Sequence, residues 1–581
     1  MASTRDHKQE TKHDSKHDPK HDAKQNNNYE ILPGSKRTVL AGAKLVGPAN
    51  ANQHIEVTLK LRRMKELPNL QSRPARAMSR DEFAATYGAS QKDIDEAKTV
   101  LGKFGLTLVH SNPAARSIRF SGTVAQMENA FQVKLFNYAH ESGNYRGRVG
   151  DVHVPAELNG IVVGVFGLDN RRVARRRRQP VRDTIRARSA GSIPASWYTP
   201  AKLATHYNFP AAQPIQNNGQ GQTVGILEFG GGFFEPDLEK FCKQTQTAVP
   251  TVKAISTDGT ATNAHDGAEG EVMLDVEVVA GVCPKASIVL YFADFTEQGW
   301  ITALDSAVQD KENDPGVISV SWGYAEDADI WTQQAMTQVN EAMKAAAYLG
   351  VTICVAAGDD GSSDAITDGH AHVDFPSSSP YALAVGGTTV VSSAAGATDV
   401  VWKEGDGLRA DNGGSTGGGV SAVFARPTWQ TTAAANIVSV NPGAIEGRVV
   451  PDVAANADWN ASPYLLVVDG KAEPNGGTSA ATPLMASLVT LINQQRGAGN
   501  RIGYLTPLLY QNATGASAGQ TVGSAGCTDV KTGNNTTDAI GGYSAGPGYD
   551  AVSGWGTPNG QKLMAVLPPA AAAATSRTSA A

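Results

Sequence analysis

Residues 351–364 read VTICVAAGDDGSSD, an apolar run of strand length that stops at a glycine and two aspartates. Other short runs rich in β-branched residues occur along the same part of the chain, and helical stretches such as 270–282 and 331–350 separate several of them. Buried strands that alternate with helices predict a parallel sheet covered by helices, an α/β fold. Glycine-rich turns follow several of these strands, and α/β proteins place their active sites at such turns. The other runs are QTVGILEF (222–229), ASIVLYFA (286–293), VISVSWG (317–323) and YALAVGGTTVV (381–391).

The composition divides the 581 residues into several parts, as a chain of this length predicts. Ahead of the α/β part, HIEVTLKLRR (54–63) alternates apolar and polar residues as a half-buried strand does, and SRDEFAATYG (79–88) begins with a serine suited to cap a helix. We therefore expect a small α+β domain, an antiparallel sheet with helices on one face. The predicted parts are a disordered polar leader (1–28), this α+β domain (29–168), an exposed arginine-rich linker (169–194), the α/β domain (195–568) and a disordered tail (569–581).

The charges are unevenly distributed. Residues 1–188 hold 33 Lys and Arg against 19 Asp and Glu, a net charge of +14, and residues 189–581 hold 17 against 37, a net charge of −20. The two parts should therefore attract one another. Nine arginines lie in the run 171–188 without a nucleic-acid-binding motif, so nucleic acid is not an expected partner. The sequence has no uninterrupted apolar stretch of 18 residues, so no membrane span is expected, and the four scattered cysteines are expected to be buried thiols.

GGTSAATPLMASLVTLINQQ (476–495) places Ser479 after two glycines and at the start of a helical run. A serine there lies at the positive end of the helix dipole, which favours developing negative charge, although many serines at this position only cap the helix. The glycines leave room for a substrate backbone, and the stretch GTSxAxP resembles the nucleophile motif of subtilisin-like serine peptidases. Such an enzyme also needs a histidine base, but none of the four histidines after the linker lies in an HGTH-type motif.

Two carboxylates on one helix are candidates for that base. In GEVMLDVEV (270–278), Glu271 and Asp275 are four residues apart, so on a helix they point to the same side. Like charges repel, and the pKa of one carboxyl should be raised. A solvated acidic face is the ordinary explanation of such a pair. Here the pair interrupts a mostly apolar helix, where buried carboxylates are costly, and a serine nucleophile needs a base with an orienting partner.

Asp359 is a third candidate, because it directly follows the apolar strand and Gly358. An oxyanion can be stabilised by a hydrogen-bond donor, and an aspartate donates only when it is protonated. The alternative is an ordinary Asp-Gly turn at the end of a strand. Asp360, the next residue, leaves the assignment between the two aspartates open.

Together these residues resemble the sedolisin family of serine-carboxyl peptidases, over about residues 30–568 and with the motifs in the family's order. The resemblance implies a subtilisin-like α/β catalytic domain preceded by an inhibitory prodomain. It also implies that Ser479 is the nucleophile, Glu271 the general base, Asp275 its partner and Asp359 the oxyanion acid.

Three further residues match the family in cleft or supporting positions. Glu228 in ILEFGGG and Trp322 in SVSWG resemble residues that extend the hydrogen-bond chain of the Glu/Asp pair. Asp374 in HVDFP resembles an acidic residue that lines the substrate cleft. A Glu or Trp at the end of a strand is often structural, and that alternative stays open.

The segment 527–558 is rich in glycine and aspartate and is expected to be largely loop. Calcium prefers about six oxygen ligands from carboxylates, carbonyls and water. Without the family, an ordinary glycine-rich loop is the simpler interpretation, because the EF-hand pattern is absent. The resemblance implies one Ca²⁺ ion, with the carboxylates of Asp529 and Asp550 and the carbonyls of Val530, Gly546 and Gly548 as ligands.

Chemistry of this kind should operate in acid. A histidine base, with a pKa of about 6.5, is protonated there, whereas a glutamate at about 4.3 is still partly ionised near pH 4, and Asp359 must keep its proton. Acid would also neutralise the carboxylates of the α/β domain, so the prodomain would loosen and the linker be cut by the enzyme itself.

We therefore expect a secreted, monomeric endopeptidase that acts on proteins or peptides, although no signal peptide is visible. An exopeptidase that removes tripeptides, and a calcium-bound scaffold protein that has lost catalysis, are the alternatives.

Overall fold

The computed structural model describes residues 28–173, 175–176, 194, 196–211, 217–394, 396–409, 413–537 and 540–569. Of the predicted parts, the leader up to residue 27, most of the linker and the tail beyond residue 569 lie outside the described residues.

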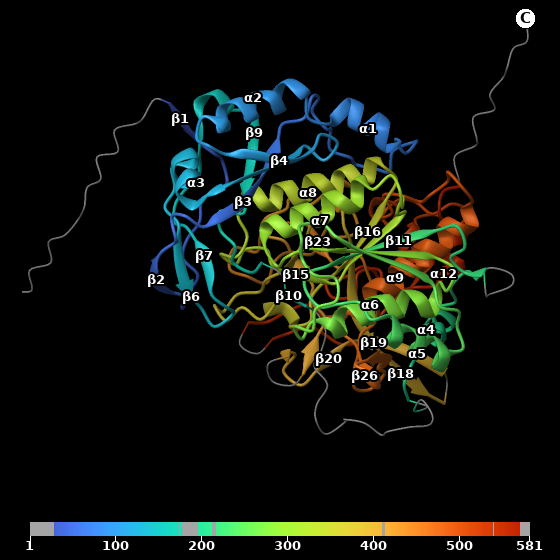
Figure 1. Ribbon diagram of the computed structural model, residues 1–581. Helices are drawn as coiled ribbons and strands as arrows, with labels where there is room; N and C mark the ends of the chain where they lie inside the picture. Colours follow the sequence, from blue (N-terminus) through green and yellow to red (C-terminus); the bar gives the residue numbers. More distant parts are fainter. Residues whose placement is uncertain are drawn as a thin grey trace, which may run out of the picture.

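An eight-stranded sheet organises the C-terminal part of the chain (Figure 1). Its strand order is β12-β13-β11-β14-β16-β18, and β18 also pairs with both β24 and β19. Every pair is parallel except β18 and β19, so the predicted parallel α/β sheet is confirmed. The strands are β11 (Thr223–Glu228), β12 (Thr251–Ser256), β13 (Ser287–Phe292), β14 (Val317–Val320), β16 (Thr352–Ala356), β18 (Leu383–Ser393), β19 (Gly396–Val401) and β24 (Val453–Asn456).

Helices cover both faces of this sheet, as Figure 1 shows. Side chains alternate along each strand: Val224 and Ile226 of β11 pack into the core with α6 and α9, whereas Leu227 packs into the core with α7 and α8. The first face carries α4 (Pro200–His206), α5 (Glu235–Thr245), α6 (Glu269–Val282) and α9 (Thr478–Arg496), and the second carries α7 (Glu297–Gln309) and α8 (Gln333–Tyr348).

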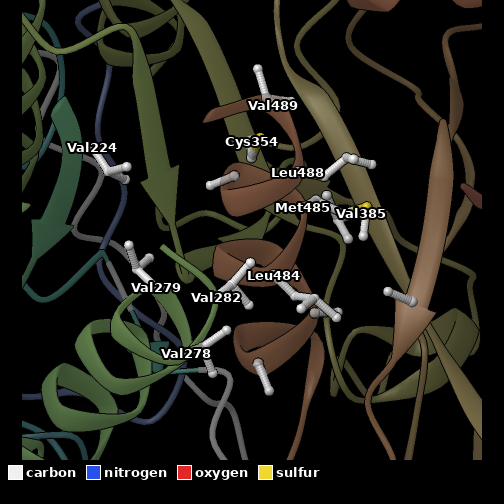
Figure 2. Packing of buried hydrophobic residues seen from close by; sticks show 14 of the residues in the cluster. Val224, Val278, Val279, Val282, Cys354, Val385, Leu484, Met485, Leu488 and Val489 are labelled. Atoms are coloured by element: carbon white, nitrogen blue, oxygen red, sulfur yellow. The ribbon is translucent and has the colours of Figure 1, made fainter. Parts of the chain in front are cut away.

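Helix α9 lies inside the domain and is buried from Thr478 to Asn493. Figure 2 shows Leu484, Met485 and Leu488 of this helix among valines of α6 and the sheet. The helix is apolar or small on nearly all sides, as a fully buried helix must be. Its first residues are therefore fixed by packing over the whole length of the helix.

Smaller elements connect and extend these layers. The four cysteines are free thiols; Cys242, Cys283 and Cys354 are buried, as expected, whereas Cys527 is only partly buried. The smaller elements are β10 (Arg175–Arg176), β15 (Trp322–Ala325), β17 (Asp374–Phe375), β20 (Lys403–Glu404), β21 (Gly414–Ser415), β22 (Gly419–Val420), β23 (Val449–Val450), β25 (Tyr464–Val468), β26 (Lys471–Asn475), α10 (Thr506–Leu509), α11 (Val522–Gly526), β27 (Cys527–Thr528), β28 (Thr557–Pro558) and α12 (Gly560–Val566).

The N-terminal domain is built on a four-stranded antiparallel sheet of order β4-β5-β3-β9, which confirms the predicted α+β class. Helices α2 and α3 cover one face and share its apolar core. The elements are β1 (Tyr29–Ile31), β2 (Lys44–Pro48), β3 (His54–Leu61), α1 (Arg80–Tyr87), α2 (Gln91–Gly102), β4 (Thr107–Asn112), β5 (Ser117–Thr123), α3 (Val124–Phe131), β6 (Phe136–Ala139), β7 (Tyr145–Gly147), β8 (His153–Pro155) and β9 (Val162–Phe166).

Helix α1 departs from the prediction that the helices share one face of this sheet. Its predicted cap is present, because Ser79 accepts a hydrogen bond from the Glu82 backbone N–H. Phe83 and Tyr87, however, belong to the core of α7 and α8, and Phe83 contacts the Tyr348 ring. The apolar side of α1 therefore packs in the junction between the two domains.

The other face of the N-terminal sheet lies on α7 and α8 (Figure 1). Lys60 of β3 is buried there and forms a 2.6 Å ion pair with Asp305 of α7. Burial lowers the pKa of Lys60 to about 8, although Asp305 counteracts the shift. Arg116 donates a hydrogen bond to Gln338 of α8 across the same junction. A basic domain thus docks on an acidic one through specific pairs, in keeping with the charge division of the sequence.

Candidate active site

The predicted site residues gather at the carboxyl edge of the parallel sheet. Glu228 is the last residue of β11, Ser321 directly follows β14, and Asp359 follows β16 by three residues. The carboxyl ends of parallel strands meet at one edge, which is where α/β proteins bind ligands. Helix α9 also begins at this edge, because the backbone of Gly358 accepts a hydrogen bond from the Thr478 hydroxyl.

Ser479 is the second residue of α9 and is fully buried. Its Oγ has no hydrogen-bond partner among the described residues. Gly477, just before the helix, has a φ of 92°, a conformation that favours glycine. The room that Gly476 leaves is not open to a substrate as predicted, because a Cβ there would lie 2.4 Å from the Ala457 carbonyl oxygen. The glycines shape the turn that presents the hydroxyl.

Three carboxyl groups are buried together next to this turn. Glu271 and Asp275 lie on α6, as predicted, and Glu228 faces them from β11; all three side chains are fully buried. The pKa of Asp275 is raised by burial and further by the charges of Glu228 and Glu271. Burial and the Glu271 charge likewise raise the pKa of Glu228. Carboxyls this close cannot all be ionised, so they share protons as a group.

Two hydrogen bonds orient this group. The Ser321 hydroxyl donates to Asp275 Oδ1 at 2.8 Å and lies 3.3 Å from the Ser479 carbonyl oxygen, so it joins α6 to the start of α9. The Trp322 indole N–H donates to Glu228 Oε2 at 3.1 Å. Trp322 and Glu228, the two residues predicted to support the Glu/Asp pair, are therefore in contact with one another.

The two aspartates after β16 have different partners. Asp359 Oδ1 accepts hydrogen bonds from the Thr478 backbone N–H at 2.8 Å and from its hydroxyl at 2.6 Å. Asp360 instead binds Arg409, whose Nε donates to Oδ2 at 2.9 Å and whose backbone N–H donates to Oδ1 at 3.0 Å. Asp359 is therefore the aspartate that faces the start of the Ser479 helix.

Asp374 lies beneath the segment that follows β14. It begins β17 and pairs with Ala325 of β15, and a Cβ added at Gly323 would lie 2.1 Å from Asp374 Oδ1. The carboxyl therefore sits directly against the Gly323 backbone.

On the other side of β15, Arg175 and Arg176 of the linker pair antiparallel with Gly323 and Trp322. The linker backbone thus forms a strand beside the candidate site.

Sequence reasoning missed three contributors. Ser321 and Thr478 directly precede Trp322 and Ser479, which are themselves predicted site residues. Their position next to these residues is the signal in the sequence that could have found them. Arg409 occurs in a stretch without any motif, and only its contact with Asp360 reveals it.

Four of the five predicted calcium residues contact one another in two pairs. Asp529 Oδ2 accepts a hydrogen bond from the Gly548 backbone N–H, and Asp550 Oδ2 accepts one from Gly546, both at 3.0 Å. Hard carboxylate oxygens of this kind suit calcium. A separate group, His265, Glu269 and Asp469, brings its ligand atoms within 4.8 Å of one another, largely at the surface.

Comparisons with known proteins agree with this architecture. Residues 41–171 match the family model described as Pro-kumamolisin, activation domain, and residues 254–556 match the Subtilase family. The chain is 41% identical to kumamolisin of Bacillus sp. (strain MN-32) over 94% of this chain and 97% of that protein. It is 28% identical to tripeptidyl-peptidase sed5 of Aspergillus fumigatus over 92% of this chain and 97% of that protein.

A solved structure, Pseudomonas sedolisin (serine-carboxyl proteinase) complexed with two molecules of pseudo-iodotyrostatin, aligns with a TM-score of 0.52 and 28% identity, covering 63% of this chain and 97% of that one. The fold and the matches define a subtilase-type serine peptidase with an N-terminal activation domain. More specifically, the chain belongs to the sedolisin family of serine-carboxyl peptidases and is similar to kumamolisin over nearly its whole length.

The raised pKa values at the site give a testable dependence of stability on pH. Because the folded pKa values of Asp275 and Glu228 exceed the unfolded values of about 4, the stability they contribute is full below pH 4 and is lost as pH rises. In a Ser479→Ala background, the double variant Glu228→Gln/Asp275→Asn should gain stability relative to its parent as pH rises. The gain should be up to about 1.4 kcal/mol per pH unit for each group.

Guanidinium-chloride unfolding at several pH values between about 4 and 7 measures this difference. Glu66→Gln/Glu141→Gln, which removes two exposed carboxylates, is the control. A difference between variant and parent that does not change with pH would contradict the assignment of raised pKa values.

Proposed function

We propose that the chain is an acid-acting endopeptidase, made as a self-processing proenzyme, in which Ser479 is the nucleophile and Glu271 the general base. Asp275 is the partner of Glu271, and Asp359 is the oxyanion acid. The observation that carries the proposal is the cluster of buried carboxyl groups that Ser321 joins to the start of the Ser479 helix.

The histidines of the catalytic part support the carboxylate base, because each has a partner elsewhere. In the part of the chain that the structure describes, His206 contacts Asp399, His265 stacks on Phe234, and His370 and His372 contact Asp368. A different group must therefore take the proton of the Ser479 hydroxyl.

The proposed reaction uses the site in two steps. Glu271 accepts the proton from Ser479 Oγ as that oxygen attacks the peptide carbonyl carbon, and it then gives the proton to the leaving amine. Water resolves the acyl-enzyme by the same route in reverse. Asp275, oriented by Ser321, shares its proton with Glu271 and so keeps the pair at a single negative charge.

Asp359 supplies the hydrogen bond to the oxyanion. Its Oδ1 already accepts from Thr478, so a protonated Oδ2 is the donor in this proposal. Arg409 would favour an ionised Asp359, but Asp360 is the largest electrostatic partner of that arginine. Asp360 therefore lets Asp359 hold its proton in acid.

Substitution of Asp359 should move the pH profile. Asp359→Asn supplies a donor that does not titrate, so the alkaline limb of kcat/KM should shift to higher pH, whereas Asp359→Ala should lower kcat about 10²–10³-fold. Asp360→Asn should move the alkaline limb to lower pH, since Arg409 then acts on Asp359 alone. Cleavage of an internally quenched peptide over a pH series measures all three. An unchanged profile in Asp359→Asn would exclude the oxyanion role.

The same peptide separates the two modes of peptide cleavage. When both of its ends are blocked, the peptide can be cut by an endopeptidase but not by an exopeptidase that needs a free N-terminus. Removal of tripeptides is the alternative mode, and one relative is named a tripeptidyl-peptidase. We expect cleavage of the blocked peptide in acid and none by Ser479→Ala. Labelling of Ser479 by an acylating inhibitor would exclude a catalytically inactive scaffold.

The N-terminal domain is proposed to act as the intramolecular inhibitor. Its docking on α7 and α8 through Lys60 and Arg116, and the linker strand β10 beside Trp322, support this role. In this proposal, the extended linker paired along β15 takes the place of a substrate backbone. Acid then weakens the ion pairs of the junction, and the linker becomes a substrate.

Incubation of the full-length protein in acid should therefore produce self-cleavage. Wild type should lose its N-terminal part, with a new N-terminus close to SIPASWYTP (192–200), and Ser479→Ala should stay intact. Lys60→Met should be processed at higher pH, because Asp305 is then buried without its partner, while Lys103→Met, at an exposed pair, should behave as wild type. Gel sizing and N-terminal sequencing report the result. Equal processing of purified Ser479→Ala would reject self-cleavage.

One Ca²⁺ ion is proposed at the turn that joins Asp529 and Asp550. Calcium would stabilise the folded catalytic domain in proportion to RT ln(1 + [Ca²⁺]/Kd), about 2.7 kcal/mol at a hundredfold excess over Kd. Added calcium should raise the melting temperature of the Ser479→Ala protein and not that of the same protein with Asp529→Asn/Asp550→Asn. Magnesium is the control ion. Equal calcium responses in both proteins would place the ion elsewhere.

Extracellular action as a monomer is the proposed setting, since an acid optimum requires an acidic surrounding. Among the described residues, no helix combines the length and apolar character needed to cross a bilayer.

A further inference from the structure

A large cavity among the described residues lies away from the candidate active site. It has a volume of about 890 Å³ and is lined by the loop before α1, the start of β11 and the segments that follow α8 and α9. The start of β11 is the amino edge of the parallel sheet, whereas Ser479 lies at the carboxyl edge. Because its wall includes both Arg73 and Arg496, the cavity exists only while the prodomain is docked.

The cavity is strongly basic. Its only acidic lining residues among those described are Asp81 and Asp314. Asp314 contacts Arg80 and Arg501, Asp81 contacts Lys311, and Glu82 contacts Arg76. The six basic lining residues are Arg73, Arg76, Arg80, Lys311, Arg496 and Arg501.

Two of these arginines have no acidic partner among the described residues. Arg496 donates from Nε to the Asn500 carbonyl and from Nη1 to the Pro568 carbonyl, but its Nη2 is buried without a hydrogen-bond partner. The Arg73 side chain, half-buried, has neither a hydrogen bond nor an ion pair within that part of the chain. Burial lowers the pKa of Arg496, and so does the charge of Arg73, which places the two guanidinium groups near one another.

Like charges that face one cavity repel, and a buried N–H group without an acceptor is costly. Guanidinium groups are planar forks of donors that match phosphate and sulfate oxygens. The wall beside them is open, because Cβ atoms added at Gly497 and Gly499 would meet nothing within 4 Å. We propose that this cavity binds a polyanion with several phosphate or sulfate groups, which bridges Arg73 of the prodomain and Arg496 of the catalytic domain.

Binding of this kind would oppose release of the prodomain. The arginines stay charged at every relevant pH. A polyanion that bridges Arg73 and Arg496 would therefore still hold the prodomain on the catalytic domain where acid has weakened ion pairs of the junction.

Calorimetric titration of the full-length Ser479→Ala protein with inorganic tripolyphosphate tests the proposal without any need for catalysis. We expect saturable binding at one site, weakened at least about tenfold in Arg73→Gln/Arg496→Gln. Hydrogen exchange of residues 73–87 should slow when the ligand is bound, since the bridge includes Arg73. A sulfated disaccharide, titrated in parallel, shows whether phosphate or sulfate is preferred; binding of either class supports the site.

The matched control is Lys103→Gln/Lys253→Gln, which removes one exposed lysine from each domain and changes the net charge equally. It should bind as the parent does. Equal weakening in the control would assign the effect to net charge and overturn the proposal, as would the absence of saturable binding by both ligands. Melting curves of both double variants show that they remain folded.

Discussion

The burial of three carboxyl groups in one place is the constraint on which the site depends. Glu228, Glu271 and Asp275 are fully enclosed between β11, α6 and the start of α9. Such a group is tolerable only if protons are shared among its members, because several isolated negative charges in an apolar interior would cost several kcal/mol each. Ser321 and Trp322 donate hydrogen bonds to Asp275 and Glu228, and shared protons balance the charge of the group.

The packing of helices α6 and α9 fixes the positions of the residues at the site. Helix α9 is buried along most of its length, and α6 is apolar all round except for its carboxyls, so the two helices cannot shift relative to the sheet without opening the core. Ser479 and Asp275 are thus fixed by contacts far from themselves. The prodomain docks on the opposite face, over α7 and α8, and it also reaches the carboxyl edge: Arg37 pairs with Glu297 at the start of α7, and the linker pairs with β15 as strand β10. The docking contacts therefore extend from the outer helices to the edge of the sheet that holds the candidate site.

The sequence predicted what depends on local pattern. The alternation of apolar runs and helices gave the parallel sheet, and the spacing of Glu271 and Asp275 on an apolar helix gave their common side. What it could not predict depends on contacts between distant segments. Arg409 and Asp360, 49 residues apart, decide which aspartate faces Thr478, and nothing in either local pattern indicates that pair. Helix α1 was assigned to the wrong layer for the same reason, since its periodicity shows an apolar face but not the partner of that face.

The pKa of Asp169 and the pKa values of the carboxyls at the site are shifted in opposite directions. Asp169, where the linker begins, has a lowered pKa, because Arg37 and Arg171 outweigh the effect of its burial. Its bidentate pair with Arg171 contributes stability that is lost only as the pH falls through that lowered pKa, below about 3.8. The carboxyls of the site, with raised pKa values, take up protons at higher pH. On acidification these carboxyls of the site thus begin to take up protons before the pair between Asp169 and Arg171 is lost, so the junction and the site respond over different ranges of pH.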